Sequence, residues 1–163
     1  MFTLRSSAFG HESEIPARHT CDGEDPSPEL RWSDPPVGTR SFALIVDDPD
    51  APDPAAPKRT WVHWVRYGIA ATRDSLLEGA GNEPPGDGER GALNDSNERG
   101  WHGPCPPIGR HRYFFRLFAL DGPIPDLGPG AARADLERAM EGHVLGTAVL
   151  MGTYARTAVH TSP

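Results

Sequence analysis

The chain has 163 residues, of which 37% are hydrophobic and 24% are charged, so it can bury a proper core without disulfide or metal staples. Its formal net charge of -7 argues against a nucleic-acid or anionic-membrane surface, because both need clustered lysine and arginine, and Lys58 is its single lysine. Glycine and proline, at 18 residues each, make up more than a fifth of the chain. This composition favours many short strands joined by turns over long helices.

Two further features of the sequence bear on its compartment. Apolar runs such as "FALIV" and "VLM" are too short to span a bilayer, and the start "MFTLRSSAFGHESE" lacks the apolar region of a secretory signal. We therefore expect a cytoplasmic protein without integral membrane contact, organised as one domain over residues 1–163.

The first predicted strand is "SFALIVDD", residues 41–48, an unbroken apolar run that ends in acids and Pro49. The second is "TWVHWVRYG", residues 60–68, which is rich in aromatic and β-branched residues. Strand alternation predicts that His63 shares one face with Trp61, Val65 and Tyr67, and that Val62, Trp64 and Arg66 share the other.

Later in the chain, "RYFFRLFALD" predicts a third strand over residues 112–121, and "LMGTY" predicts a strand at residues 150–154. Between them, residues 132–145 have apolar side chains at helical spacing, with Gly130 and Gly142 near the ends. We expect one helix there and a loose tail over residues 157–163.

Two segments between these elements are predicted to be loops. Residues 50–59, "DAPDPAAPKR", contain too many prolines to pair as a strand, and residues 79–100 are polar and rich in glycine. A loop of the second length inside a compact domain is usually functional or poorly ordered.

Polar groups that could carry chemistry gather around the predicted strand ends. They are Asp47, Asp48 and Asp50 after the first strand, His63 within the second, and His111 and Tyr113 at the start of the third. Neighbouring strands bring such groups together, and strand parity would place Asp48 beside Asp50 if the strand continued through Pro49.

Each of these signals also has a purely structural interpretation. A strand histidine is more often a hydrogen-bonded core residue than a ligand, "DDPD" could form an acidic turn, and "GPCPP" could form a rigid corner. Taken together, however, imidazole beside carboxylate with a tyrosine hydroxyl as a neutral donor would suit an oxyanion such as phosphate or carboxylate.

Five stretches, in order, resemble the phosphatidylethanolamine-binding protein (PEBP) family in its bacterial YbhB/YbcL-type branch, the Raf kinase inhibitor-like proteins. They are "PARHTCDGEDPSPELRWSDPP", "DDPDAP", "WVHWV", "GPCPPIGRHRYFFRLFALD" and "GHVLGTAVLMGTYAR". The resemblance runs from about Phe2 to Arg156. It implies a mainly β fold, an antiparallel β-sandwich with a few short peripheral helices.

The resemblance also implies an anion pocket at the strand ends, which in related proteins accepts phosphate, acetate, cacodylate or a phosphorylethanolamine head group. His63 and His111 would donate hydrogen bonds to the anion, Asp48 would orient an imidazole or bind an amine, and Tyr113 would lend its hydroxyl. The predicted site residues are Asp48, Asp50, Pro52, His63, Gly103, Pro104, Cys105, Pro106, His111 and Tyr113. We expect His102 to lie at the surface.

The two cysteines, Cys21 and Cys105, have no C-x-x-C spacing, so neither a zinc ribbon nor a thioredoxin motif is present. In a reducing cytosol we expect two free thiols. The resemblance places their loops on the same side of the sandwich, so a disulfide is the alternative, which requires Cα atoms within roughly 7 Å.

Three functions fit these residues. We expect a non-catalytic binder of a small anion or phosphorylated ligand, with a role in regulating signalling or other enzymes. Kinase inhibition is not carried over, because the C-terminal helix of animal members has no counterpart before Pro163. A hydrolase with Asp48, His63 and His111 as acid and base is the alternative, although no G-x-S-x-G motif supports covalent catalysis.

The third function is a metal site of two histidines and a carboxylate, which meets the ligand count but lacks preorganising spacing such as H-x-x-x-H. We therefore expect neither metal nor cofactor. The resemblance suggests a homodimer. Because imidazolium binds anions better than imidazole, we expect anion affinity to fall as pH rises through the histidine pKa, about 6.5 when unperturbed.

Overall fold

Two β-sheets and one α-helix make up the computed structural model, which describes residues 1–86 and 88–156. The predicted tail over residues 157–163 lies outside the described residues. The strands are β1 (Thr3–Arg5), β2 (Ser13–Glu14), β3 (Leu30–Ser33), β4 (Ser41–Ala51), β5 (Arg59–Ala70), β6 (Ser75–Leu76), β7 (Arg90–Ala92), β8 (His111–Leu120) and β9 (Val144–Tyr154). The helices are α1 (Arg133–Met140) and two single 3-10 turns, η1 (Ala17–His19) and η2 (Ala80–Asn82).

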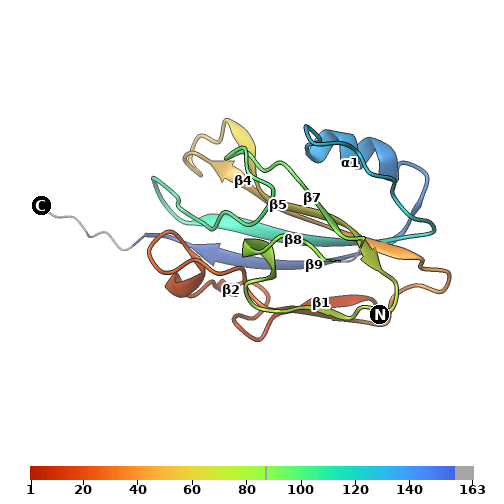
Figure 1. Ribbon diagram of the computed structural model, residues 1–163. Helices are drawn as coiled ribbons and strands as arrows, with labels where there is room; N and C mark the ends of the chain where they lie inside the picture. Colours follow the sequence, from red (N-terminus) through yellow and green to blue (C-terminus); the bar gives the residue numbers. More distant parts are fainter. Residues whose placement is uncertain (87, 157–163) are drawn as a thin grey trace, which may run out of the picture.

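The larger sheet has the strand order β2-β9-β8-β4-β5-β7, and the smaller sheet has the order β1-β3-β6. All pairings are antiparallel except that of β2 with β9. In Figure 1 the small sheet lies below the long strands and α1 lies above them. The prediction of a mainly β sandwich with short peripheral helices is confirmed.

Both faces of the larger sheet are covered, which explains the unbroken apolar run in β4. Phe42, Leu44 and Val46 face the small sheet, where they join the larger core cluster. Ala43 and Ile45 belong to the second cluster, on the side of α1. A strand buried on both faces loses the apolar and polar alternation of a surface strand and reads as a continuous hydrophobic run.

The predicted strands are present, and most are longer than the sequence pattern indicated. β4 continues past Asp48 to Ala51 and pairs there with Arg59, the first residue of β5. The Lys58 amide also donates to the Ala51 carbonyl at 2.8 Å. The proline-rich segment 50–59 is therefore a hairpin connection, and the prediction that it does not pair is wrong at both of its ends.

The helix predicted over residues 132–145 is shorter than expected at its C-terminal end. α1 ends at Met140, and Gly142 follows with a φ of 79° in the left-handed region. The chain then enters β9 at Val144, so Gly142 terminates the helix where the apolar spacing suggested that it continued. Leu136 and Met140 are the α1 residues that reach the core.

The long loop over residues 79–100 is held by its own hydrogen bonds in the part that the structure describes. It contains η2 and β7. Asn94 accepts from the amides of Ser96 and Glu98 and donates to the Gly100 carbonyl. Arg66 and Glu89 form an ion pair whose side chains are each 7% exposed, which anchors the loop to β5.

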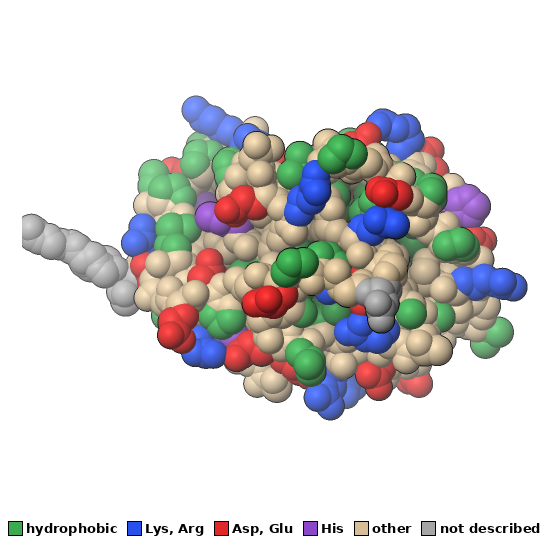
Figure 2. All heavy atoms as spheres, in the orientation of Figure 1, with side chains coloured by type: hydrophobic (Ala, Val, Ile, Leu, Met, Phe, Trp, Pro, Cys, Tyr) green, Lys and Arg blue, Asp and Glu red, His purple; other side chains and the backbone are tan. Residues whose placement is uncertain are grey.

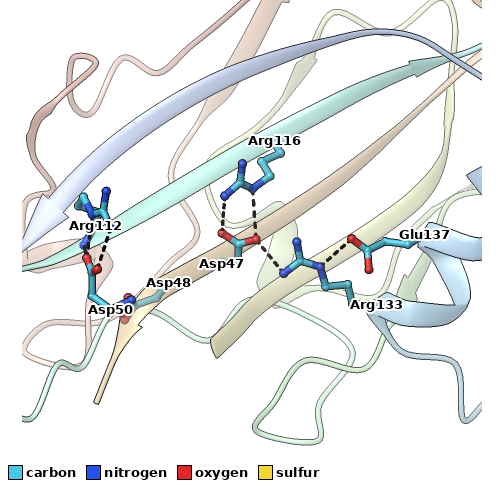
Figure 3. Close-up of polar contacts among 7 residues, drawn as sticks. All are labelled: Asp47, Asp48, Asp50, Arg112, Arg116, Arg133 and Glu137. Atoms are coloured by element: carbon cyan, nitrogen blue, oxygen red, sulfur yellow. Dashed lines mark hydrogen bonds and ion pairs between the residues drawn. The ribbon is translucent and has the colours of Figure 1, made fainter. Parts of the chain in front are cut away.

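A second buried ionic cluster joins α1 to the sheet (Figure 3). The Asp47 carboxylate, 1% exposed, accepts two hydrogen bonds from Arg116 of β8, at 3.1 and 3.2 Å. Arg133 of α1 lies 2.7 Å from the same carboxylate and also pairs with Glu137. The Asp47 side chain therefore lies on the helix side of the sheet, whereas its neighbour Asp48 lines a cavity.

The surface gives no sign of a one-signed binding face in the view of Figure 2, where basic and acidic side chains are interspersed. Within the residues that the structure describes, no helix is both long and apolar enough to cross a membrane.

Candidate functional site

A cavity of about 230 Å³ opens where β4, β5 and β8 meet the segment after Gly100. Asp48, His63, His111 and Tyr113 all contribute to its lining, although they come from three different strands. Each of the four residues is at most 4% exposed. The cavity is small, at the size of a head group rather than of a drug-sized ligand.

Asp48 and His111 form a buried pair at the base of this cavity. Nδ1 of His111 lies 2.6 Å from Oδ2 of Asp48, and Nε2 lies 2.9 Å from the Ile108 carbonyl oxygen. The carbonyl can only accept, so Nε2 of His111 carries a proton. A further proton lies between Nδ1 and Oδ2, and the pair is neutral overall whichever of the two atoms holds it.

Burial sets the protonation behaviour of the carboxyl in this pair. Burial raises the pKa of Asp48 above its usual value, while the hydrogen bond with His111 works in the opposite direction. Oδ1 of Asp48 also accepts the backbone amide of Asp50 at 2.7 Å. Both nitrogens of His111 have oxygen partners, Asp48 and the Ile108 carbonyl. This differs from the expected role of His111 as a hydrogen-bond donor to the ligand.

His63 is the extra residue of a β-bulge. Val46 of β4 pairs with Trp64 of β5, whereas the next residue, Asp47, pairs with Val62, so His63 has no partner of its own on β4. Val62 packs on the helix side of the sheet and Trp64 packs between the sheets. The prediction that these two residues share a face is therefore wrong, because a bulge shifts the alternation by one residue.

The bulge places the His63 ring at the cavity, where one of its two nitrogens already makes a hydrogen bond. Its Nδ1 donates to the His102 carbonyl oxygen at 2.5 Å, which leaves the lone pair of Nε2 without a partner among the described residues. Burial lowers the pKa of His63 to about 4. At neutral pH the ring is therefore uncharged, and Nε2 is an acceptor.

Tyr113 brings the one hydroxyl group of the site. Its ring meets the edge of the His63 ring with centroids 5.3 Å apart and stacks with the His111 ring at 6.3 Å. In the described part of the chain, its hydroxyl is the one buried side-chain polar atom without a hydrogen-bond partner. Burial raises the pKa of Tyr113, so the group remains a neutral O–H.

A disulfide fixes the wall of the cavity. Cys21 and Cys105 are bonded, with Cα atoms 5.4 Å apart, so the expectation of two free thiols is wrong. The Cys21 amide also donates to the Pro104 carbonyl at 3.1 Å. The two cysteines are 84 residues apart along the chain, so their contact depends on how the two loops pack in the folded protein.

Asp25 supports the same wall from behind. Its carboxylate accepts from the Trp101 indole at 2.8 Å and from the Gly103 amide at 3.1 Å. A Cβ atom on Gly103 would lie 2.0 Å from Oδ1 of Asp25, so the close approach of this carboxylate needs a glycine at position 103.

Among the ten residues predicted for the site, Asp50 and Pro104 are the two that do not line the cavity. The turn formed by the Asp50 amide and the Asp48 carboxylate rotates the Asp50 side chain away. There it binds the guanidinium of Arg112 at 2.9 and 3.0 Å, as Figure 3 shows. Asp50 is thus placed to anchor the strand end, and this ion pair lowers its pKa.

Three lining residues were not predicted from the sequence: Ala51, Trp61 and His102; Pro107 also lines the cavity, as expected from the loop of residues 103–107. Strand parity with His63 was a signal for Trp61, and adjacency to Gly103 was a signal for His102. The His102 side chain is 44% exposed, so it lies at the mouth of the cavity rather than on an open surface.

We expect His63 to make the fold sensitive to mild acid, lowering the free energy of unfolding by about 2 to 3 kcal/mol between pH 6.5 and 4. The unfolded chain takes up a proton on this ring below about pH 6.5, whereas the folded ring stays neutral down to about pH 4. Stability therefore falls as pH falls through this window. Urea unfolding at pH 7.0, 5.5 and 4.5 measures the loss.

The matched variants are His63→Gln, which removes the titrating group, and His143→Gln, which alters an exposed histidine. His63→Gln should show a shallower pH dependence than the wild type, and His143→Gln should keep the wild-type dependence. Parallel curves for the wild type and His63→Gln would contradict the assignment.

Comparison with known proteins gives consistent matches over nearly the whole chain. The family model described as phosphatidylethanolamine-binding protein matches residues 5–155. A UPF0098 protein from Methanothermobacter thermautotrophicus is 49% identical over 156 residues, which cover 94% of this chain and 98% of that protein. A second UPF0098 protein, from Aquifex aeolicus, is 45% identical over 153 residues, covering 93% of this chain and 86% of that protein.

Solved structures agree with these matches. The chain is similar to a PEBP homolog from Chlamydia trachomatis, with a TM-score of 0.85, 37% identity and coverage of 95% of this chain and 97% of that one. It is also similar to YbcL from E. coli, described as a member of the mammalian PEBP family, with a TM-score of 0.85, 30% identity and coverage of 95% and 98%.

The two packed sheets with a cavity at the strand ends thus define a PEBP-like β-sandwich. The chain belongs to the phosphatidylethanolamine-binding protein family, and its similarity to YbcL and to the chlamydial homolog makes it a bacterial-type member.

Proposed function

We propose that this protein binds a small oxyanion or a phosphorylated ligand in the cavity between β4, β5 and β8, without turning it over. Phosphate, acetate and phosphorylethanolamine are the ligand types that suit it. The observation that carries the proposal is the Tyr113 hydroxyl, buried at the cavity without a partner. A buried polar group left unsatisfied costs about 1 to 3 kcal/mol, and a ligand oxygen would supply the missing hydrogen bond.

The hydrolase alternative finds less support in the same geometry. His111 cannot act as a free base while Asp48 and the Ile108 carbonyl occupy its two nitrogens. The sulfur of Cys105, a candidate nucleophile at the cavity, is held in the disulfide. In the described residues no group of three histidine, cysteine or carboxylate side chains is arranged to hold a metal ion. A binding site is therefore the function that these side chains favour.

Two further properties stay predictions. Association into a homodimer follows from the resemblance, and sedimentation analysis would measure it. The cytoplasmic location rests on the sequence, whereas the disulfide between Cys21 and Cys105 is more typical of an oxidising compartment.

We expect O-phosphorylethanolamine and inorganic phosphate to bind to the purified protein, and Tyr113→Phe to weaken binding about tenfold or more. Hydrogen bonds to charged groups contribute about 1.5 to 3 kcal/mol, which corresponds to this loss. Isothermal titration calorimetry of both variants measures the dissociation constants.

The matched control is Tyr67→Phe, because Tyr67 is equally buried but its hydroxyl accepts from the Leu127 amide on the helix side of the sheet. This variant should bind both ligands as the wild type does. The proposal fails if no anion binds, or if Tyr113→Phe and Tyr67→Phe bind equally well.

A further inference from the structure

The cavity holds few hydrogen-bond donors for an anionic ligand. Pro52, Pro106 and Pro107 contribute lining without a backbone N–H. Both nitrogens of His111 have oxygen partners, and Nδ1 of His63 donates to the His102 carbonyl. Among the described lining residues there is neither a lysine nor an arginine. A fully deprotonated dianion would therefore leave water for a site without a cation and with few donors, which is unfavourable.

Among the four buried polar side chains of the lining, Asp48, His63, His111 and Tyr113, two groups remain to meet a ligand, and they differ in kind. The Tyr113 hydroxyl can donate, whereas Nε2 of neutral His63 can only accept. Their rings are in contact, with centroids 5.3 Å apart, and both residues line the same cavity, so a head group held there lies beside both of them. The complement of one donor beside one acceptor is an acid group that keeps its proton, with an oxygen to accept and an O–H to donate.

We propose that the cavity selects the singly protonated form of an oxyacid, a phosphate monoester monoanion or a carboxylic acid, and shares the ligand's proton with Nε2 of His63. This inference rests on the proposed binding function and specifies its ligand class. The bound complex then contains one proton more than the free protein and the fully deprotonated ligand together.

The charged groups around His63 do not protonate its ring before the ligand binds. Asp47 and Asp95 favour the charged ring and the His102 side chain disfavours it, but burial outweighs them and holds the pKa of His63 at about 4. The Tyr113 hydroxyl, facing His63 from β8, stays neutral. Asp48 shares its proton with His111 on the other side of Tyr113. Above about pH 5 the proton therefore arrives with the ligand.

The test compares methyl phosphate with methyl sulfate by calorimetry at pH 6, 7 and 8. The methyl phosphate monoanion and methyl sulfate share shape and charge, but only the phosphate carries an O–H. Because a phosphate monoester loses its second proton near pH 6, we expect the association constant of methyl phosphate to fall about tenfold from pH 7 to pH 8. Methyl sulfate should bind at least tenfold more weakly than methyl phosphate at pH 6, with no pH dependence.

Repeating the titrations at pH 8 in two buffers of different ionisation enthalpy counts the protons. We expect close to one proton taken up per methyl phosphate bound. Tyr113→Phe should weaken binding at each pH and keep the pH dependence, whereas His63→Gln should flatten it. Binding of methyl phosphate that is independent of pH, or methyl sulfate binding equally well, overturns this inference and leaves anion binding standing. Failure of every probe to bind at any pH overturns the proposed function as well.

Discussion

Replacing Cys21 and Cys105 together by serine is expected to lower the free energy of unfolding by about 3 to 4 kcal/mol. The disulfide joins residues 84 positions apart, so it removes a large amount of conformational freedom from the unfolded chain. Both cysteines are exposed, so serine adds no penalty for burying a hydroxyl. Urea unfolding followed by circular dichroism measures the difference.

Reduction provides the control for this experiment. Dithiothreitol should destabilise the wild-type protein by a similar amount and leave the double serine variant unchanged. A loss below about 1 kcal/mol would show that the hydrogen bond from the Cys21 amide to the Pro104 carbonyl and the contacts of Asp25 hold the wall without the covalent link.

The strands could be predicted because their apolar residues mark the positions that are buried in the fold. The continuous apolar run in β4 reflects a sheet covered on both faces, by the small sheet and by α1. The predicted alternation of side chains along β5 was wrong around His63, because a β-bulge places one extra residue of β5 opposite β4. The bulge arises from the pairing of the two strands, so the sequence of either strand alone does not reveal it.

The site residues were predictable to the extent that motif and parity determine direction. Asp48, His63, His111 and Tyr113 lie together at the cavity, as their positions at the strand ends suggested. The side chain of Asp50 turns to Arg112, because a local hydrogen bond after Pro49 ends the alternation. Distances through space, such as that between the two cysteines, follow from loop packing and could not be obtained from spacing along the chain.

The second large effect concerns Asp47, whose replacement by alanine should lower the free energy of unfolding by about 3 to 4 kcal/mol. The carboxylate is 1% exposed and pairs with Arg116 and Arg133 at once. Its loss leaves two guanidinium groups beside each other without their shared counterion. Arg116 and Arg133 keep 31% and 24% exposure, so partial solvation holds the loss to the lower part of the range for breaking a buried ion pair.

The position of Asp47 between the sheet and α1 adds a local consequence. Without the ion pair to Arg133, the helix is attached mainly by Leu136 and Met140, so its amides should exchange with solvent faster than they do in the wild type, and by a larger factor than the amides of β8. Glu24→Ala is the matched control, because Glu24 pairs with Arg18 while its side chain is 83% exposed, and exposed pairs contribute about 0 to 1 kcal/mol. If Asp47→Ala unfolds no more easily than Glu24→Ala, or if exchange in α1 is unchanged, then apolar packing alone holds the helix on the sheet.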